Sequence, residues 1–213
     1  MKLFKIFKNK KVIVTGHTGF KGSWLTLWLL KLGANVMGIS KNIITNPSHF
    51  SSLGLKKNIL HRQFDIKDLK KLEETFNKFQ PSFVFHLAAQ SLVRKSYNFP
   101  IDTINSNTIG TLNVLESLKK INKNCSVVFI TSDKVYRNRE LNRGYKENDI
   151  LGGHDPYSAS KAAAENIIYS YMKSYFNKKN SNISISIARA GNVIGGGDWS
   201  EDRIIPDCIK SWS

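Results

Sequence analysis

Short apolar runs alternate with longer amphipathic stretches along the whole chain. The apolar runs predict strands, and they cover residues 11–15, 35–40, 59–65, 82–88, 126–132 and 183–188. Stretches with helical spacing lie between them and predict helices over residues 21–32, 68–79, 103–122 and 157–177. This alternation is typical of βαβ units. The chain is therefore predicted to be α/β, with a Rossmann-type doubly wound parallel sheet and helices on both faces.

A glycine-rich turn follows the first predicted strand. Gly16, Gly19 and Gly22 recur at intervals of three before an amphipathic helix. Glycine lets the backbone approach a pyrophosphate closely, and the helix N-terminus offers unpaired N–H groups and a positive dipole end. Between a strand and a helix, this motif predicts a dinucleotide-binding site. The residues expected to line it here are Gly16, His17, Thr18, Gly19, Phe20 and Gly22.

The next two predicted strands end where the adenosine half of a dinucleotide would lie. An acidic residue about 20 positions beyond the motif would hold the ribose 2′-hydroxyl. The second strand instead ends at Ser40-Lys41-Asn42. Lys41 could face a 2′-phosphate, so the sequence leaves both NAD and NADP open. Asp65 and Ile66, which close the third strand, are expected to contact adenine.

Two further motifs carry groups suited to proton transfer. Tyr157 and Lys161 lie one helical turn apart on the same face. A phenol is a poor base near pH 7, because lowering its pKa by about three units takes roughly 4 kcal/mol. A neighbouring ammonium and an oxidised nicotinamide ring would both favour the phenolate. Tyr157 is therefore predicted to take a proton from an alcohol as hydride leaves its carbon.

The fifth predicted strand ends in Thr131-Ser132-Asp133-Lys134, at the sheet edge where active groups gather. Ser132 can hydrogen-bond a substrate oxygen and Asp133 can give or accept a proton, while a desolvated Lys134 can act as a base. The predicted catalytic residues are Ser132, Asp133, Lys134, Tyr157 and Lys161.

These motifs, together with residues 86–90 (HLAAQ), resemble the extended short-chain dehydrogenase/reductase family that acts on nucleotide sugars. Residues 189–199 (RAGNVIGGGDW) are similar to the branch that dehydrates CDP-linked glucose, and related branches carry Glu in place of Lys134. The resemblance spans nearly the whole chain. It implies cofactor contacts from Leu87, Ala88, Ala89, Tyr157 and Lys161, and substrate contacts from Gln90, Arg94, Asn192 and Arg203. Arg94 could instead pair with a surface carboxylate.

The resemblance also implies a reaction with NAD as the cofactor. Tyr157 would remove the sugar 4-hydroxyl proton while C4 passes hydride to NAD. Lys134 would then take the C5 proton, and Asp133 would protonate the departing C6 hydroxyl. The hydride would return to C6 and give a 4-keto-6-deoxy sugar, so that NAD acts as a resident catalyst with no net redox change.

The same resemblance implies an organisation and leaves alternatives open. Residues 1–200 are expected to form the dinucleotide-binding domain with the catalytic residues, and 201–213 the start of a substrate-binding region that is cut short. The implied assembly is a homodimer or a dimer of dimers. A nucleotide-sugar epimerase or reductase would need no Asp-Lys pair, and a catalytically impaired dinucleotide-binding protein would need no turnover.

Composition restricts the partners and the compartment. Of 213 residues, 32 are Lys or Arg and 16 are Asp or Glu, but the excess is mostly scattered lysine and does not predict nucleic acid as a partner. Cys125 and Cys208 have no neighbours at metal-ligand spacing, so neither a disulfide framework nor a metal site is expected. A cytoplasmic setting fits best. No apolar run approaches the roughly 20 residues that cross a bilayer.

Overall fold

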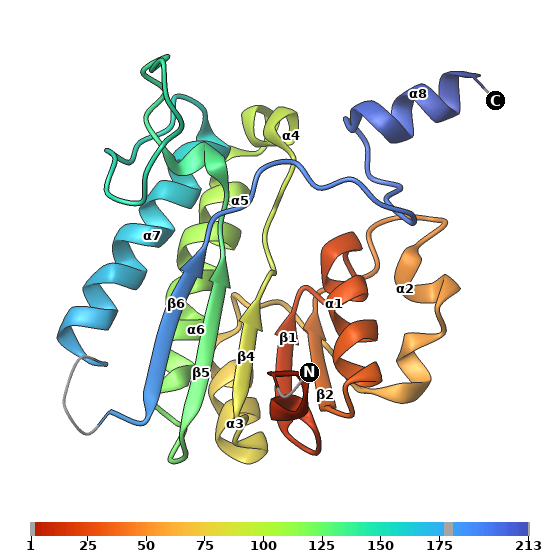
Figure 1. Ribbon diagram of the computed structural model, residues 1–213, viewed down its shortest axis with the longest axis vertical. Coiled ribbons are helices and arrows are strands. Elements are labelled where there is room, and N and C mark those ends of the chain that lie inside the picture. The colour runs from red at the N-terminus through yellow and green to blue at the C-terminus, as the bar shows by residue number, and fades with distance from the viewer. Residues whose placement is uncertain (1–2, 177–180, 213) are drawn as a thin grey trace.

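Six parallel strands form one sheet at the centre of the molecule (Figure 1). The computed structural model describes residues 3–176 and 181–212. The strands are β1 (Lys11–Thr15), β2 (Asn35–Ser40), β3 (Leu60–Gln63), β4 (Phe83–His86), β5 (Cys125–Ile130) and β6 (Ile183–Ala188). Their order, β3-β2-β1-β4-β5-β6, reverses direction between β1 and β4. This is the doubly wound Rossmann order, so the predicted fold class is confirmed.

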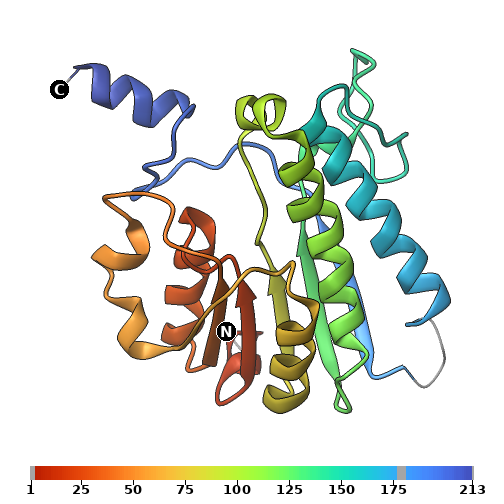
Figure 2. The ribbon, with the colours of Figure 1, turned by 180° about the vertical axis from the view of Figure 1, so that it is seen from behind.

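Helices cover the sheet on both faces. They are α1 (Phe20–Lys31), α2 (His49–Ser52), α3 (Leu69–Phe79), α4 (Val93–Asn98), α5 (Pro100–Ile104), α6 (Gly110–Leu118), α7 (Pro156–Ser174) and α8 (Ile204–Trp212). Helices α3, α6 and α7 lie side by side across one face of the sheet (Figure 2). Helix α1 packs against the opposite face. The first strand therefore has a helical layer on each side.

The side chains of β1 show how the sequence pattern produces these layers. Ile13 belongs to the larger core with Phe76 of α3. Val12 and Val14 point the other way and pack with Leu29 of α1. Successive side chains of a strand alternate between faces, so a strand that is covered on both faces must be apolar throughout. This is why the run at 11–15 carries no internal polar break.

Some predicted boundaries were wrong. The expected helix over 103–122 is divided into α5, a π-helical turn (Asn105–Ile109) and α6. Helix α5 begins earlier because Pro100 suits the first position of a helix. Strands β3 and β4 are shorter than predicted. Residue 177, the predicted end of the last long helix, lies outside the described residues.

The last helix stands apart from the sheet. Helix α8 has no buried residue and projects beyond the strand ends (Figures 1 and 2). Residue 213 lies outside the described part of the chain, and the division near residue 200 stays a prediction. None of the described helices has the length and apolar character that a membrane crossing requires.

Candidate active site

A cavity of about 900 Å³ opens at the carboxyl ends of the central strands, where the strand order reverses. Its walls are the glycine-rich turn, the segments after β4 and β5, and the segment that follows β6. That last segment crosses above the strand ends toward α1 and α2 before it reaches α8 (Figure 1). Ligands of open α/β sheets bind at this kind of crevice.

The glycine-rich turn packs against the end of β4 and leaves its backbone open to the cavity. Gly16 has φ +75°, and a Cβ there would lie 2.7 Å from the backbone nitrogen of Ala88. A Cβ on Gly22 would lie 2.1 Å from the Gly16 carbonyl oxygen, so only glycine fits at either position. Gly19 caps α1 without a side-chain hydrogen bond, which leaves first-turn N–H groups available to an anion. This cradle fits the pyrophosphate of a dinucleotide.

Most of the predicted cofactor residues line this cavity. From the turn and its neighbours these are Gly16, Thr18, Gly19, Phe20, Gly22, Lys41, Asp65, Ile66, Leu87, Ala88 and Ala89. Lys41 forms an ion pair with Asp65, with 3.3 Å between ammonium and carboxylate. Asp65 also accepts a hydrogen bond from the Lys67 backbone N–H. The charge of Lys41 is therefore balanced within the chain.

His17, by contrast, lies behind the turn and is fully buried. Its Nε2 is 2.7 Å from Nδ1 of His61, and its Nδ1 is 2.9 Å from the Ser40 hydroxyl. The ring meets Phe50 edge to face. Burial lowers the pKa of His17 to about 4, so the ring is neutral at pH 7. The structure gives this side chain a packing role rather than a place on the cavity wall.

The predicted catalytic residues come together at the end of β5 and the start of α7. The Ser132 hydroxyl donates to Oδ1 of Asp133 at 3.0 Å, and the Lys134 ammonium lies 3.2 Å from the same oxygen. Tyr157 and Lys161 are 7% and 8% exposed. Ser132, Lys134 and Tyr157 line the cavity together with the glycine-rich turn. The arrangement places an alcohol-activating phenol beside a carboxylate and an amine.

The start of α7 explains why Tyr157 sits at this point. Asp155 caps the helix and accepts hydrogen bonds from the backbone N–H and the hydroxyl of Ser158, at 2.9 and 2.5 Å. Pro156 occupies the first helical turn. Both features fix the first residue of a helix. The phenol is therefore held at a defined helix start, and Lys161 follows one turn later.

The electrostatics of the pair differ from the sequence-based expectation. Burial raises the pKa of Tyr157 above its usual value, and the nearby Asp133 adds to this effect. The Ser132 hydroxyl and Arg203 oppose it without reversing it. Burial lowers the pKa of Lys161 to about 8, and repulsion from Lys21 contributes. The chain alone therefore favours the neutral phenol, and a phenolate requires further positive charge from a bound ligand.

The lowered pKa of Lys161 predicts a pH-dependent stability. Between about pH 8 and 10.5 the unfolded chain still holds the proton that the folded chain has released, so stability rises with pH. The rise is about 3 kcal/mol at 1.36 kcal/mol per pKa unit. Lys161→Met should lack this rise and be more stable than wild type at pH 7. Urea unfolding from pH 7 to 10 measures it, with exposed Lys70→Met as the control. Parallel curves for Lys161→Met and wild type would contradict the prediction.

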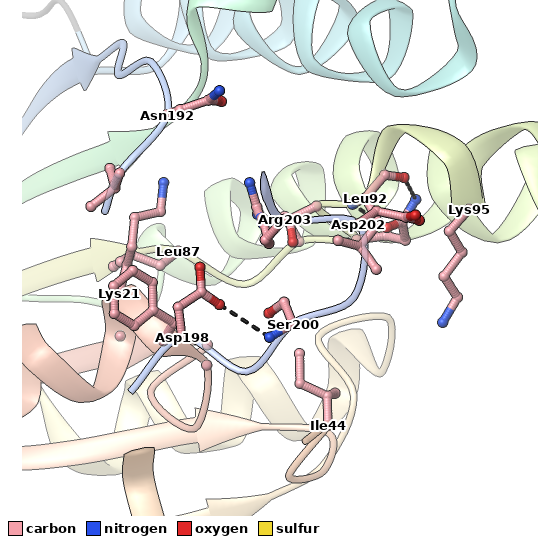
Figure 3. Close-up of a pocket in the computed structure, with 18 of the residues that line it drawn as sticks. Lys21, Ile44, Leu87, Leu92, Lys95, Asn192, Asp198, Ser200, Asp202 and Arg203 are labelled. Carbon is pink, nitrogen blue, oxygen red and sulfur yellow. Dashed lines mark hydrogen bonds between the residues drawn. The ribbon is translucent and has the colours of Figure 1, made fainter. Parts of the chain in front are cut away.

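The predicted substrate residues fall into two groups. Asn192 and Arg203 line the cavity, and the Arg203 Nε is buried without a hydrogen-bond partner among the described residues (Figure 3). Gln90 also lines it, but its side-chain amide is bonded to the Leu92 backbone at 2.6 and 3.0 Å. Arg94 is exposed and pairs with Asp202 at 3.1 Å. Asn192 and Arg203 are thus better placed to receive a ligand.

Sequence reasoning passed over Lys21, which lies within the glycine motif and lines the cavity. Figure 3 shows Lys21 and Arg203 extending into the same space. Partial burial lowers the pKa of Lys21, and repulsion from Arg203 adds to the effect. Lys134 also lowers the pKa of Lys21, and the Asp133 carboxylate opposes the shift without reversing it. Motif spacing carries no signal for this residue, since the glycine pattern leaves its position free.

A second missed feature anchors the segment after β6. The Trp24 indole N–H donates to the Gly196 carbonyl at 2.9 Å. Gly197 has φ +83°, and a Cβ there would lie 2.3 Å from the His49 ring. The glycines of residues 195–197 therefore let this segment lie close against α1 and α2. Their sequence was visible, but their partners lie more than 140 positions away.

Comparisons with known proteins agree with this geometry. A CDP-glucose 4,6-dehydratase from Salmonella typhimurium is 47% identical over 97% of this chain. This chain spans 58% of that relative's length. The structure of epimerase Mth375 from Methanothermobacter thermautotrophicus matches with a TM-score of 0.83 and 28% identity, over 97% of this chain and 59% of that one. UDP-glucose 4-epimerase of Thermus thermophilus, in complex with NAD, matches with a TM-score of 0.75 and 28% identity. The match covers 90% of this chain and 58% of that one.

The fold and the site together define a dinucleotide-binding protein of the extended short-chain dehydrogenase/reductase type. The sequence pattern of the GDP-mannose 4,6 dehydratase family matches residues 13–188, and the chain belongs to that family. The resemblance to the branch that dehydrates CDP-linked glucose is confirmed by the similarity to the Salmonella protein.

Proposed function

We propose that this chain carries the NAD-binding and catalytic part of a nucleotide-sugar 4,6-dehydratase that acts on CDP-glucose. One observation carries the proposal: Ser132, Lys134 and Tyr157 line the same cavity as the glycine-rich turn, and Asp133 is bonded to both Ser132 and Lys134. The 47% identity to a CDP-glucose 4,6-dehydratase supports the choice of sugar nucleotide.

NAD is the proposed cofactor. Gly16, Gly19 and Gly22 would hold its pyrophosphate, and Asp65 with Ile66 its adenine. The NAD complex of the Thermus epimerase supports this choice. So does the Lys41–Asp65 ion pair, because a balanced charge gives a 2′-phosphate less attraction than a free lysine would. When bound, NAD would supply reversible hydride transfer, as the acceptor for C4 of the sugar and the donor for C6.

The residues of the chain would supply the proton transfers. Ser132 hydrogen-bonds the sugar O4, and Tyr157 takes the proton from the 4-hydroxyl as hydride leaves C4. The resulting ketone acidifies the C5–H bond. Lys134, in its neutral form, takes the C5 proton. Asp133, in its acid form, protonates the C6 hydroxyl, which leaves as water. As hydride adds to C6, the Lys134 ammonium returns its proton to C5. Tyr157 releases its proton to solvent, Asp133 regains one from solvent, and the 4-keto group is retained.

The contact between Asp133 and Lys134 explains how both roles can be available at once. Their charged atoms lie 3.2 Å apart. One proton moving from the ammonium to the carboxylate converts the ion pair into a carboxylic acid and a neutral amine, which are the acid and the base that the elimination needs. In water this transfer is unfavourable. Bound substrate would exclude water from the cavity, and a low dielectric disfavours the charged pair.

The decisive experiment is incubation of the purified chain with CDP-glucose and NAD, followed by the absorbance that 4-keto sugars develop in alkali. Lys134→Ala should still form the 4-keto intermediate, seen as reduced dinucleotide, while water loss falls by about 100-fold or more. Lys70→Ala, on the outer surface of α3, is the control.

An unchanged rate of water loss in Lys134→Ala would contradict the dehydratase proposal. It would favour an epimerase, because epimerisation needs no Asp-Lys pair. The similarity to epimerase Mth375 supports that alternative. A chain that binds NAD but turns over no nucleotide glucose would be a binding protein only.

A homodimer, or a dimer of dimers, is the proposed assembly. Exposed apolar side chains lie on α5, the π-helical turn and α7, which pack against one another: Ile101, Ile104, Ile109 and Tyr169 are 75%, 44%, 40% and 61% exposed. Burial of such side chains drives association. Size-exclusion chromatography with light scattering should therefore give at least twice the 24.1 kDa chain mass. A strictly monomeric protein would contradict the proposal.

The cytoplasm is the proposed compartment. Cys125 and Cys208 are both free thiols. Burial raises the pKa of Cys125 to about 12, which keeps it protonated and unreactive. Unpaired thiols are typical of reducing compartments.

A further inference from the structure

Glu165 and Arg189 form an ion pair behind the proposed active site, between a buried carboxylate and a partly buried guanidinium. Glu165 on α7 is 1% exposed, and neither residue lines the cavity. The Arg189 guanidinium donates through Nε and Nη2 to the Glu165 carboxylate, at 3.0 and 2.6 Å. Such a two-pronged pair fixes geometry as well as charge. Arg189 opens the segment that resembles the CDP-glucose branch, yet the proposed reaction gives it no role.

The pair joins the elements that carry the catalytic groups. Oε1 of Glu165 also accepts a hydrogen bond from the Thr131 hydroxyl at 2.5 Å, and Thr131 immediately precedes Ser132. Glu165 itself lies one helical turn beyond Lys161 on α7. Backbone hydrogen bonds from Thr131 to Ala188 and from Asp133 to Ala190 tie the same strand end to the residues beside Arg189. The ion pair therefore connects the ends of β5 and β6 to the helix that holds Tyr157.

Arg189 extends this connection to the loop over residues 137–155. Its Nη1 donates to the Tyr136 hydroxyl at 2.7 Å and to the Glu147 carbonyl at 3.0 Å. The guanidinium also lies 4.6 Å from the centre of the Tyr136 ring. The loop ends at Asp155, the residue that caps α7 before Tyr157. The Arg189 side chain thus contacts α7 through Glu165, and it contacts the loop that precedes α7 through Glu147.

We propose that Glu165 and Arg189 are positioning residues, which set the placement of Ser132 relative to Tyr157 and Lys161 by holding β5, β6, α7 and the 137–155 loop in one arrangement. This inference rests on the proposed function, because it assigns the pair to that reaction. Catalytic geometry is sensitive to such placement, since a shift of about 1 Å can lower a rate by about 100-fold. Neither residue lines the cavity where substrate and dinucleotide are proposed to bind, so the effect should fall on turnover rather than on binding.

Arg189→Lys tests the inference, because it keeps the positive charge and removes the fork that reaches Tyr136 and Glu147. Tyr136→Phe is the milder variant and removes one hydroxyl acceptor only. Arg143→Lys is the matched control: Arg143 donates to both oxygens of Asp149 at 2.7 and 2.8 Å in an exposed part of the same loop. The measurements on CDP-glucose are kcat and KM. Three further measurements do not depend on activity: the dissociation constant for NAD, the melting temperature and the rate of tryptic cleavage within residues 137–155.

In Arg189→Lys we expect kcat per NAD-binding site to fall by about 10- to 100-fold, with KM and the NAD dissociation constant within about threefold of wild type. Tyr136→Phe should show a smaller fall of the same kind, and Arg143→Lys should match wild type. Cleavage of the loop should be faster in Arg189→Lys than in Arg143→Lys. A merely structural role would lower the number of NAD-binding sites or the melting temperature while kcat per site stays unchanged.

Three outcomes would overturn the inference: wild-type kcat per site in folded Arg189→Lys, an equal fall in Arg143→Lys, or equal loop cleavage in these two variants. Failure of the proposed function is distinguishable, because the wild-type chain itself would then turn over no nucleotide glucose. In that case the difference in loop cleavage between Arg189→Lys and Arg143→Lys still tests whether Arg189 holds the loop. Equal rates would show that Arg189 does not hold the loop.

Discussion

Tyr157→Phe is expected to lower the turnover of CDP-glucose by about 1,000-fold, within the range of about 10² to 10⁴ that a positioned acid or base supplies. In the proposed mechanism the phenol takes the 4-hydroxyl proton, and phenylalanine keeps the buried ring at the start of α7, where Tyr157 is only 7% exposed. NAD binding should therefore stay within about twofold of wild type. Rapid mixing with CDP-glucose, followed by the absorbance of reduced dinucleotide, measures the first hydride transfer directly.

Tyr171→Phe is the matched control, since it removes a phenol from the same helix. The Tyr171 hydroxyl donates to Glu116 on α6, away from the cavity. It should lose some stability and keep its turnover. If Tyr157→Phe reduced NAD as fast as wild type, the phenol would have no part in removing the 4-hydroxyl proton. An equal loss in Tyr171→Phe would point instead to a general disturbance of α7.

The fold could be predicted from local sequence because its signals are local. The unbroken apolar run at β1 reflects burial on both faces, and the glycines that follow it reflect a turn that packs against Ala88. The motifs at Ser132 and Tyr157 each lie at the end or start of an element, and parallel strands bring such positions to one edge. The parallel sheet and the meeting of these motifs at its edge therefore follow from the pattern.

The environment of the site could not be predicted in the same way. The pKa of Tyr157 depends on burial by segments far along the chain, and burial outweighs the hydrogen bond from Ser132. A two-residue motif indicates that a lysine is near but not how much water surrounds the phenol. Arg189 and Glu165 are likewise 24 positions apart. Arg189 follows the end of β6 and Glu165 lies in the third turn of α7, and no sequence spacing predicts a contact between two such positions.

The division of the π-helical turn from α6 has the same origin. Asn107 in this turn accepts a hydrogen bond from the Gln90 backbone N–H at 2.8 Å and donates to the Ser160 hydroxyl at 2.9 Å. These bonds link the cavity segment after β4 to α7. The apolar periodicity predicts one continuous helix, because it carries no information on such tertiary bonds.

Gly16→Ala is expected to weaken NAD binding by about 100-fold, a loss of about 2.8 kcal/mol at about 1.4 kcal/mol per tenfold change. The added Cβ would lie 2.7 Å from the Ala88 nitrogen and 2.9 Å from its Cα. Both are backbone atoms, so no side-chain rotation relieves the clash. The turn and the end of β4 must separate, and both line the cavity where the pyrophosphate is proposed to bind.

Gly54→Ala separates this clash from backbone strain. Gly54 also has positive φ, at +59°, but a Cβ there meets nothing within 4 Å. It should therefore lose only the roughly 1–2 kcal/mol of unfolding free energy that a left-handed non-glycine residue costs, with NAD affinity unchanged. Calorimetric titration with NAD and thermal denaturation measure the two quantities. If Gly16→Ala bound NAD as tightly as Gly54→Ala, close packing of the turn against β4 would not be what shapes the binding site, since both glycines have positive φ and only Gly16 meets the backbone of Ala88.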